Sequence, residues 1–320
     1  MTATLPVIDL GTMAAGRSAR EVAARQLDDA CANAGFFYVI GHGIEPALLD
    51  RLFTVTRQFF ELPIDVKLRC FSPDTYYRGY KPAFAQVPVS PVGSNSTVAP
   101  PSPDNREQFH AGYDDLRLVQ ESGEVGPFDA PNIWSDRPAD FRAALTDYHR
   151  RMIELSLRII DLIETGLELR CQELRSLFAH PQALVSLLHY PPACPNASLA
   201  EYGIAGHTDY GFLTVLLTDE VGGLEILSEA EAWEPVAVLK DAFICNIGDI
   251  LQRITNDRYK STRHRVVSQP NRSRYSIPFF IDPTPSALLE CLPSGLATAP
   301  CRYDAVRCSD YLLRRFRRQP

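Results

Sequence analysis

The stretch Gly206-His-Thr-Asp-Tyr-Gly-Phe-Leu-Thr-Val-Leu lies in the middle of a strand-rich region. In an extended segment, residues i and i+2 project from the same face, so His207 and Asp209 can reach one metal ion while Thr208 points away. His264 lies farther along, at the start of another strand-like segment. Two imidazoles and one carboxylate form the donor set that holds iron(II) on one octahedral face and leaves three positions open. The sequence therefore predicts that His207, Asp209 and His264 bind iron(II).

Short strand-like segments surround this motif between residues 184 and 282. Each is rich in apolar residues and is bounded by turn signals such as Asp219-Glu-Val-Gly-Gly. Many short strands at this spacing are typical of a sandwich or a jelly-roll. The expected strands are Leu184–Tyr190, Phe212–Leu217, Leu224–Leu227, Val236–Val238, Ala242–Ile247, His264–Val267 and Ser276–Phe280.

The chain before this region is mainly helical by pattern. Apolar residues recur at helical spacing in residues 19–34, 46–60 and 138–169. Residues 71–103 are rich in Pro, Ser, Gly and Tyr, and their aromatic residues favour an ordered lid. The sequence thus predicts an α+β chain. Its mainly helical N-terminal and lid region, residues 1–175, packs around a β-core with a C-terminal helix, residues 176–320.

Composition limits the possible partners and the cellular setting. The 320 residues carry a formal net charge of −7, which disfavours a binder of nucleic-acid backbones. No apolar run approaches the roughly 20 residues of a membrane helix, and we expect no secretory signal. The eight cysteines form no C-x-x-C pair, so we expect free thiols in a reducing cytoplasm. A monomer or weak dimer is expected, with the basic run at residues 314–318 as a solvated helix end.

A second functional pattern follows His264. Arg274 and Ser276 flank Tyr275 and so share one face of an expected strand. The planar guanidinium matches a carboxylate, and the serine hydroxyl adds a short hydrogen bond. Because a buried arginine without a partner is energetically costly, this pair predicts an anion nearby. An internal Asp or Glu is the alternative partner.

Together these segments resemble the isopenicillin N synthase-like branch of the iron(II)/2-oxoglutarate-dependent oxygenases. The resemblance runs from about residue 5 to residue 285. It implies a double-stranded β-helix with the metal at the open end of the barrel. Besides the first stretch quoted, the matching segments include Pro6-Val-Ile-Asp, Gly35-Phe-Phe-Tyr-Val-Ile-Gly-His-Gly-Ile, Asn246-Ile-Gly-Asp, Thr255-Asn-Asp-Arg-Tyr-Lys-Ser-Thr-Arg-His-Arg-Val and Arg274-Tyr-Ser-Ile-Pro-Phe-Phe.

The resemblance also implies the cosubstrates and the reaction. Iron(II), 2-oxoglutarate and O₂ would be used, with ascorbate as a further reductant. Arg274 and Ser276 would bind the distal carboxylate of 2-oxoglutarate, with a hydrogen bond from Tyr190, whereas Leu188 stands where the family has Asn. The reaction would oxidise an unactivated C–H bond of a small metabolite, by hydroxylation, desaturation or ring closure, and release succinate and CO₂. A step in natural-product biosynthesis is the expected setting.

Several residues are candidates for the wall of a substrate pocket. Phe280 shares the strand face of Ser276, and Tyr77, Arg78 and Phe109 lie in or beside the irregular segment. An inward-pointing Arg78 would favour an acidic substrate. By contrast, we interpret His42 and His189 as packing or hydrogen-bonding histidines, and Asp249 as a turn residue, because none has metal-ligand spacing to another donor.

Other functions share parts of this pattern. An oxidase of the same fold would bind the substrate's own carboxylate at Arg274 and Ser276, without 2-oxoglutarate. A non-catalytic jelly-roll protein would keep the metal or ligand site alone. A zinc hydrolase would need a general base beside the metal, and the sequence shows no evident one. That hypothesis would also leave Arg274 unexplained. Succinate formation, and metal binding by a His207→Ala variant, distinguish these hypotheses.

Overall fold

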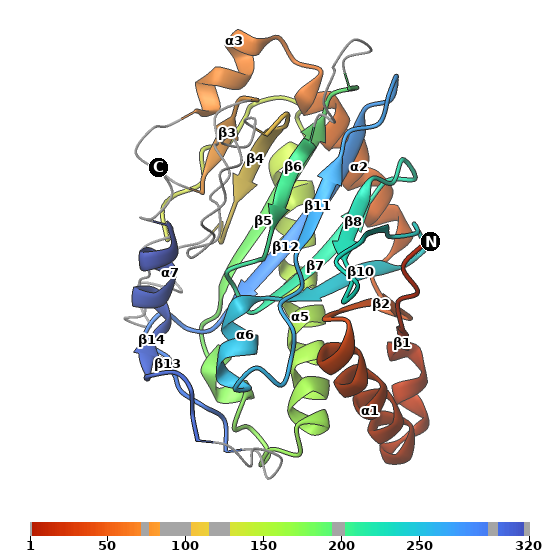
Figure 1. The fold of residues 1–320 in the computed structure, drawn as a ribbon. Coiled ribbons are helices and arrows are strands. Elements are labelled where there is room, and N and C mark those ends of the chain that lie inside the picture. Colours follow the sequence, from red (N-terminus) through yellow and green to blue (C-terminus); the bar gives the residue numbers. More distant parts are fainter. Residues whose placement is uncertain are drawn as a thin grey trace, which may run out of the picture.

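The computed structural model describes residues 2–71, 77–83, 104–114, 129–193, 202–293 and 300–316. Two sheets form its centre (Figure 1), an eight-stranded sheet in the order β1-β2-β10-β7-β12-β5-β4-β3 and a four-stranded sheet in the order β6-β11-β8-β9. The strands of the large sheet are β1 Val7–Asp9, β2 Phe36–Ile40, β3 Gly79–Lys81, β4 Glu107–Ala111, β5 Gln182–Tyr190, β7 Leu213–Thr218, β10 Phe243–Ile247 and β12 Arg274–Asp282. Those of the small sheet are β6 Tyr202–His207, β8 Leu224–Leu227, β9 Trp233–Pro235 and β11 His264–Val267.

Helices cover one face of the large sheet. In Figure 1, α5 runs behind this sheet, and both α1 and α2 contact α5. The described α-helices are α1 Arg17–Asn33, α2 Pro46–Phe60, α3 Ile64–Lys67, α5 Phe141–Gly166, α6 Asp249–Ile254 and α7 Cys308–Phe316. A short third sheet pairs β13 Leu288–Leu289 with β14 Val306–Arg307, and 3-10 turns lie at η1 Leu10–Ala15, η2 Leu68–Cys70 and η3 Arg175–Phe178.

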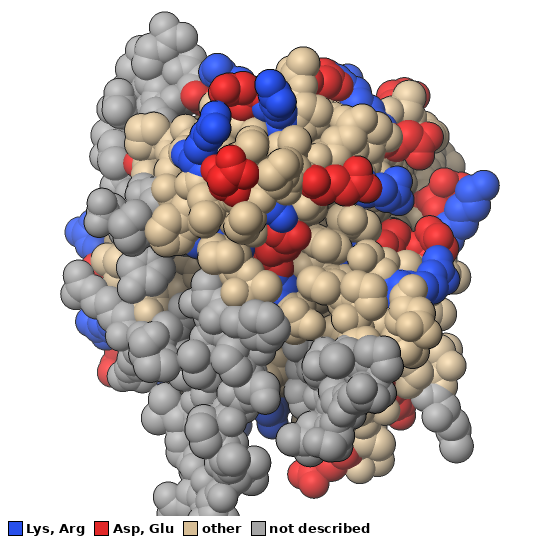
Figure 2. Space-filling model, turned by 90° about the horizontal axis from the view of Figure 1, so that it is seen from above, with Lys and Arg blue, Asp and Glu red and all other residues tan. Residues whose placement is uncertain are grey.

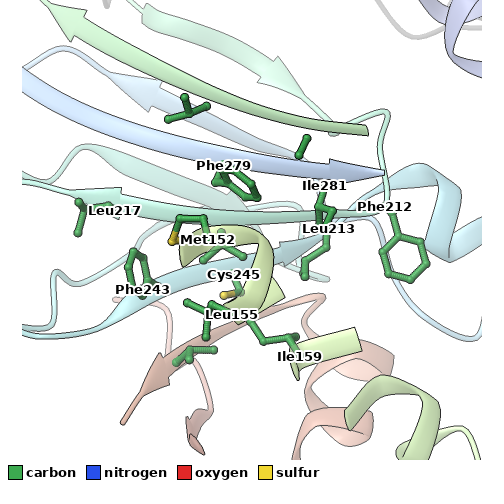
Figure 3. Close-up of a cluster of buried hydrophobic side chains, with 14 of the residues drawn as sticks. Met152, Leu155, Ile159, Phe212, Leu213, Leu217, Phe243, Cys245, Phe279 and Ile281 are labelled. Carbon is green, nitrogen blue, oxygen red and sulfur yellow. The ribbon is translucent and has the colours of Figure 1, made fainter. Parts of the chain in front are cut away.

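Alternate residues of strand β12 face either the helical core or the opposite side of the sheet. In β12, Ile277, Phe279 and Ile281 are fully buried against the helices. Figure 3 shows Met152 and Leu155 of α5 in this same cluster. Because neighbouring strand residues point to opposite faces, the intervening residues from Arg274 to Asp282 face away from α5. Only the β12 side chains that face away from the core can therefore form a site.

The predicted α+β jelly-roll is confirmed, with differences at particular elements. The helix expected at residues 46–60 is α2, and the long helix expected at 138–169 begins later, at Phe141. The strand expected at 236–238 lies earlier, at Trp233–Pro235, and β6 was not expected at all. Within the expected lid, Gly79–Lys81 forms β3, while residues 72–76 and 84–103 lie outside the described residues.

The first half of the chain supplies strands to the same sheet as the second half. Strand β2 pairs with β10, and β4 pairs with β5. The boundary expected at residue 175 falls at the start of η3, between α5 and β5. The N-terminal region is thus built into the β-core rather than only packed on it.

The cysteines correct one expectation. Cys291 and Cys301 form a disulfide, whereas we expected free thiols throughout. The other cysteines in the described part of the chain are free, and four of those five are buried. No described helix is long and apolar enough to cross a membrane.

Candidate metal centre

Three side chains from neighbouring elements converge at one end of the small sheet. His207 ends β6, His264 begins β11, and Asp209 follows β6 by two residues. One ligand atom from each lies within 4.8 Å of the others. Nε2 of His207 is 3.8 Å from Oδ1 of Asp209, and Nε2 of His264 is 3.7 Å from the same oxygen.

Strand register brings the two histidines together. His264 lies directly opposite His207 in the antiparallel pair β6–β11, and their ring centroids are 4.3 Å apart. Opposite residues in such a pair project to the same face. Strand pairing therefore places His264, far away in sequence, directly beside His207.

Hydrogen bonds set the orientation of both rings. Nδ1 of His207 lies 2.8 Å from the carbonyl oxygen of Ala205, and Nδ1 of His264 lies 3.2 Å from that of Thr262. Since a carbonyl only accepts, Nδ1 carries the proton and Nε2 presents its lone pair. Burial, together with the nearby His264, lowers the pKa of His207 to about 3, so this imidazole is neutral at physiological pH.

Asp209 uses its two carboxylate oxygens differently. Oδ2 accepts hydrogen bonds from Thr214 Oγ1 at 2.5 Å and from Asn246 Nδ2 at 2.7 Å, which leaves Oδ1 facing the histidines. Burial raises the pKa of this carboxyl, but the histidines and these hydrogen bonds outweigh it, so the pKa is lowered. Two imidazoles that present Nε2 and an ionised carboxylate that converges with them fit iron(II).

Arg274 forms a second, cationic site on β12. It is only 1% exposed, and its guanidinium lies 4.8 Å from the Tyr190 ring centroid. Nη1 donates to Ser276 Oγ at 3.0 Å and Nη2 to Thr218 Oγ1 at 3.2 Å, whereas buried Nε has no partner among the residues that the structure describes. None of the ion pairs in the described part of the chain involves Arg274. No Asp or Glu among the described residues is therefore its ion-pair partner, and the site suits an external carboxylate.

Thr218 is a contact that the sequence did not reveal. It lies opposite Ser276 in the pair β7–β12, so its hydroxyl reaches the same guanidinium. Leu188, opposite Ser276 on the other side, is 4% exposed and supplies no hydrogen bond where the family has Asn. The strand register is the only signal for Thr218, and it requires knowing which strands pair.

A cavity of about 230 Å³ extends from the metal centre across β12, β5 and β4 to α7. Three of the four predicted pocket residues, Tyr77, Arg78 and Phe280, line it. Phe109 does not. It is fully buried in the core, with its ring centroid 4.8 Å from that of Phe141. Because β4 alternates, Gln108 and His110 face the cavity instead.

The remaining sequence interpretations are borne out in part. His42 Nδ1 accepts a hydrogen bond from the Ile44 amide, and His189 Nδ1 lies 2.7 Å from Glu107 Oε1, so both are hydrogen-bonding histidines as predicted. Asp249 is not merely a turn residue, because it begins α6 and accepts a hydrogen bond from Ser261 Oγ at 2.7 Å.

Protein-family models and known relatives match this chain. The model of the 2OG-Fe(II) oxygenase superfamily matches residues 182–283, and the model of the N-terminal region of non-haem dioxygenases in morphine synthesis matches residues 5–137. The 2-oxoglutarate-dependent dioxygenase citB of Monascus ruber is 35% identical over 293 residues, which cover 87% of this chain and 84% of the relative. The homoarginine-6-hydroxylase of Arabidopsis thaliana is 32% identical over 306 residues, or 90% of this chain and 87% of the relative.

Solved structures agree with these relatives. The crystal structure of JOX2 in complex with 2OG, Fe and JA superposes with a TM-score of 0.80 at 28% identity, covering 98% of this chain and 85% of that one. A full-length Neurospora crassa protein in complex with alpha-KG and thymine gives a TM-score of 0.82 at 25% identity, covering 98% and 96%. These relatives favour use of 2-oxoglutarate over the oxidase and non-catalytic alternatives. The chain therefore belongs to the 2-oxoglutarate- and iron(II)-dependent oxygenase superfamily, and it is a dioxygenase that uses both iron(II) and 2-oxoglutarate.

Proposed function

We propose that His207, Asp209 and His264 bind the iron, and that Arg274, Ser276 and Tyr190 bind the distal carboxylate of 2-oxoglutarate. The single observation that carries this assignment is a buried cation without an ion-pair partner in the described chain, on the barrel strand whose same face also lines the metal cavity. The substrate is then a small metabolite in that cavity, with one C–H bond held near the metal.

The reaction follows from what each group provides. Bound iron(II) with 2-oxoglutarate and O₂ supplies the oxidant, with succinate and CO₂ as coproducts. The two Nε2 atoms and Asp209 Oδ1 would hold the iron beside the cavity, which His207 and Asp209 line. Arg274 fixes the direction of 2-oxoglutarate, because its fork is held by Ser276 and Thr218. Apolar side chains such as Leu188 and Phe280 keep water from the reacting bond.

The assignment is tested by separating metal binding from cosubstrate binding. His207→Ala and His264→Ala should each lose iron(II) affinity, measured by anaerobic titration. Arg274→Gln should keep iron affinity but weaken 2-oxoglutarate binding by about tenfold or more. The matched control Arg142→Gln removes an exposed arginine, 60% accessible, outside the cavity, and should change neither. Normal 2-oxoglutarate affinity in Arg274→Gln would refute the assignment of this arginine.

Succinate formation tests the chemistry directly. The parent protein should form succinate slowly in the presence of iron(II), 2-oxoglutarate and O₂ even without substrate, and the metal-ligand variants should not. Ascorbate should extend this turnover by keeping the metal reduced. An absence of succinate from the iron-loaded parent, together with no charge-transfer band on adding 2-oxoglutarate anaerobically, would refute the proposed use of this cosubstrate.

The same proposal covers the kind of substrate, the absence of a nucleic-acid or membrane partner, the oligomeric state and the compartment. Relatives named for homoarginine hydroxylation or solved with thymine support a small molecule as the substrate. On the face drawn in Figure 2, basic and acidic side chains are interspersed rather than gathered, which supports the absence of a nucleic-acid or membrane partner there. We further propose a cytoplasmic monomer or weak dimer, tested by sedimentation and by fractionation.

A further inference from the structure

Arg78 is a buried arginine that lines the cavity, distinct from Arg274 on β12. It precedes β3 directly, is 3% exposed and lines the cavity. Its Nε donates to the carbonyl oxygen of Ala130 at 2.9 Å and its Nη1 to that of Tyr77 at 2.6 Å. No hydrogen bond from Nη2 is found within the described residues. The fork is therefore fixed in place by backbone carbonyls, with one nitrogen left for another acceptor.

The charge of Arg78 is not neutralised by an ion pair in the described chain. Arg106, the other arginine at this wall, pairs with Asp104 at 3.2 Å, but no described carboxylate oxygen lies within 4.0 Å of an Arg78 nitrogen. Burial lowers the pKa of Arg78 to about 10, partly offset by Asp129, so the guanidinium is still protonated at neutral pH. A buried cation held only by carbonyls gains most from an anionic ligand.

Strand register separates Arg78 from the cosubstrate site. On β12, Arg274 lies opposite Tyr190 of β5, whereas Phe280 lies opposite Leu184, six residues farther along. Six strand residues span about 20 Å. The Arg78 guanidinium packs against Gly112, where an added Cβ would lie 2.3 Å from Nη2, and Gly112 directly follows Ala111, which lies opposite Val185. The two arginines therefore mark opposite ends of one sheet face.

The metal centre lies toward the end marked by Arg78. Thr214, which hydrogen-bonds Asp209, is opposite Phe280 in the pair β7–β12. From β7, which carries Thr214, to β4 there are three strand spacings, or about 14 Å. A ligand bound at Arg78 would therefore extend about that far to reach the metal. Apolar residues line the space between, among them Leu184, Pro278 and Phe280.

We propose that Arg78 binds a carboxylate of the substrate, so that the enzyme oxidises a small organic acid with an apolar body. This inference rests on the proposed function and names the substrate class of that site. A single negative charge fits better than a phosphate dianion, because Asp129 also lines the cavity and would repel a second charge. Arg78 is thus a specificity residue, because its distance from the metal centre sets which carbon of the acid is oxidised.

Binding of matched acids and amides tests this proposal. The protein is loaded with Zn(II) and saturating 2-oxoglutarate, so that the Arg274 site is filled and no turnover occurs. Phenylacetate, 3-phenylpropionate and 4-phenylbutyrate are then titrated calorimetrically beside their neutral amides. The parent should bind at least one acid about tenfold or more tightly than its amide. Arg78→Gln should reduce this preference to about one, and the exposed-site control Arg142→Gln should retain it.

A second variant covers the case in which Arg78→Gln fails to fold. Gly112→Ala keeps the positive charge but pushes the guanidinium out of place, and it should also reduce the acid preference. The proposal is overturned if no acid of the panel binds the parent, if amides bind equally well, or if both variants keep the preference. If the parent does not bind 2-oxoglutarate, that result contradicts the proposed function instead. Binding of 2-oxoglutarate is therefore measured separately in each titration.

Discussion

Arg315 of α7 donates a hydrogen bond to Asp249, the first residue of α6, and so ties the C-terminal helix to the metal centre. The backbone amide of Asp249 in turn donates to the carbonyl oxygen of Asp209 at 2.8 Å. The guanidinium also lies 4.3 Å from the ring centroid of Tyr210. Since Leu312 and Phe316 of α7 line the cavity, this contact holds one cavity wall in position.

We predict that Arg315→Gln loosens α7 without loss of metal. The half-buried ion pair contributes about 1 kcal/mol, so the opening equilibrium of the helix should rise roughly fivefold. Amide hydrogen exchange of residues 308–316 measures this change. Arg314→Gln, at the adjacent exposed position, is the matched control and should exchange as the parent does. Unchanged exchange of α7 in Arg315→Gln would show that other contacts hold the helix.

Two threonines of β7 should separate the two halves of the site. Thr214 bonds Asp209, whereas Thr218 bonds Arg274. Thr214→Val should weaken iron(II) binding by about 10- to 100-fold, because the carboxylate loses one of the groups that orient it. Thr218→Val, an identical change four residues away, should spare iron and weaken 2-oxoglutarate binding instead. Anaerobic titrations of both ligands against both variants check the pattern, and equal effects of the two changes on iron would contradict it.

A buried charge cluster beside β4 should dominate stability in this region. Glu107 accepts hydrogen bonds from Lys67 at 2.7 Å and Tyr80 at 2.6 Å, and it contacts His189. Glu107→Gln removes the charge opposite Lys67 and should lower the free energy of unfolding by about 3 to 5 kcal/mol. The control Glu229→Gln breaks the pair with Lys260, where the Glu229 side chain is 84% exposed, and should have almost no effect. Urea unfolding compares the two.

The charge cluster at Glu107 also predicts how the stability of the protein changes with pH. Burial raises the pKa of Glu107, but the hydrogen bonds from His189, Lys67 and Tyr80 outweigh it, so the pKa lies below its ordinary value of 4.5. Its stabilisation is therefore complete above the unfolded pKa and is lost as the pH falls through the lower folded value. The stability difference between the parent and Glu107→Gln should shrink in acid. A difference that stays constant down to the acid transition would argue against an ionised Glu107.

Asp282 should make the stability of the protein depend on pH in the direction opposite to Glu107. Burial raises its pKa to about 7 from 3.8, although the Phe212 amide donates a hydrogen bond to it. Between these values the folded protein holds a proton that the unfolded chain has lost, so stability falls as the pH rises from about 4 to 7. Asp282→Asn should remove this fall and stabilise the protein at pH 8, by up to about 4 kcal/mol for the full shift. Urea unfolding at pH 5 and pH 8 measures it, and parallel curves would contradict it.

The sequence predicted the parts of the site that local spacing determines. The i, i+2 spacing predicts that His207 and Asp209 converge, although Asp209 lies two residues beyond the end of β6. The same spacing places Arg274 and Ser276 on one face of β12, which requires no knowledge of the partner strands. By contrast, Thr218 and Asn246 enter the site through strand pairing, and sequence period does not determine which strands become neighbours. Asn246 lies in a matching family segment, but its contact with Asp209 appears only in three dimensions.

Two errors have the same physical origin. From the sequence we assign Phe109 to the pocket because it lies beside the irregular segment, but strand alternation turns it into the core and turns His110 toward the cavity. The basic end of α7 was expected to be solvated, although Arg315 is held by Asp249, far away in sequence. In both cases a tertiary contact decides the direction of a side chain that its local sequence leaves open.

The position of β2 in the large sheet has a consequence for synthesis. Its partner β10 begins at Phe243, roughly 200 residues after β2 ends at Ile40. At about 5–20 residues per second, β2 leaves the ribosome some 10 to 40 s before that partner exists. Throughout this interval its apolar edge, Phe36 to Ile40, has no strand from the C-terminal half to pair with. The nascent chain therefore depends on shielding by chaperones or by its own first helices, and fragments that end before Phe243 should aggregate.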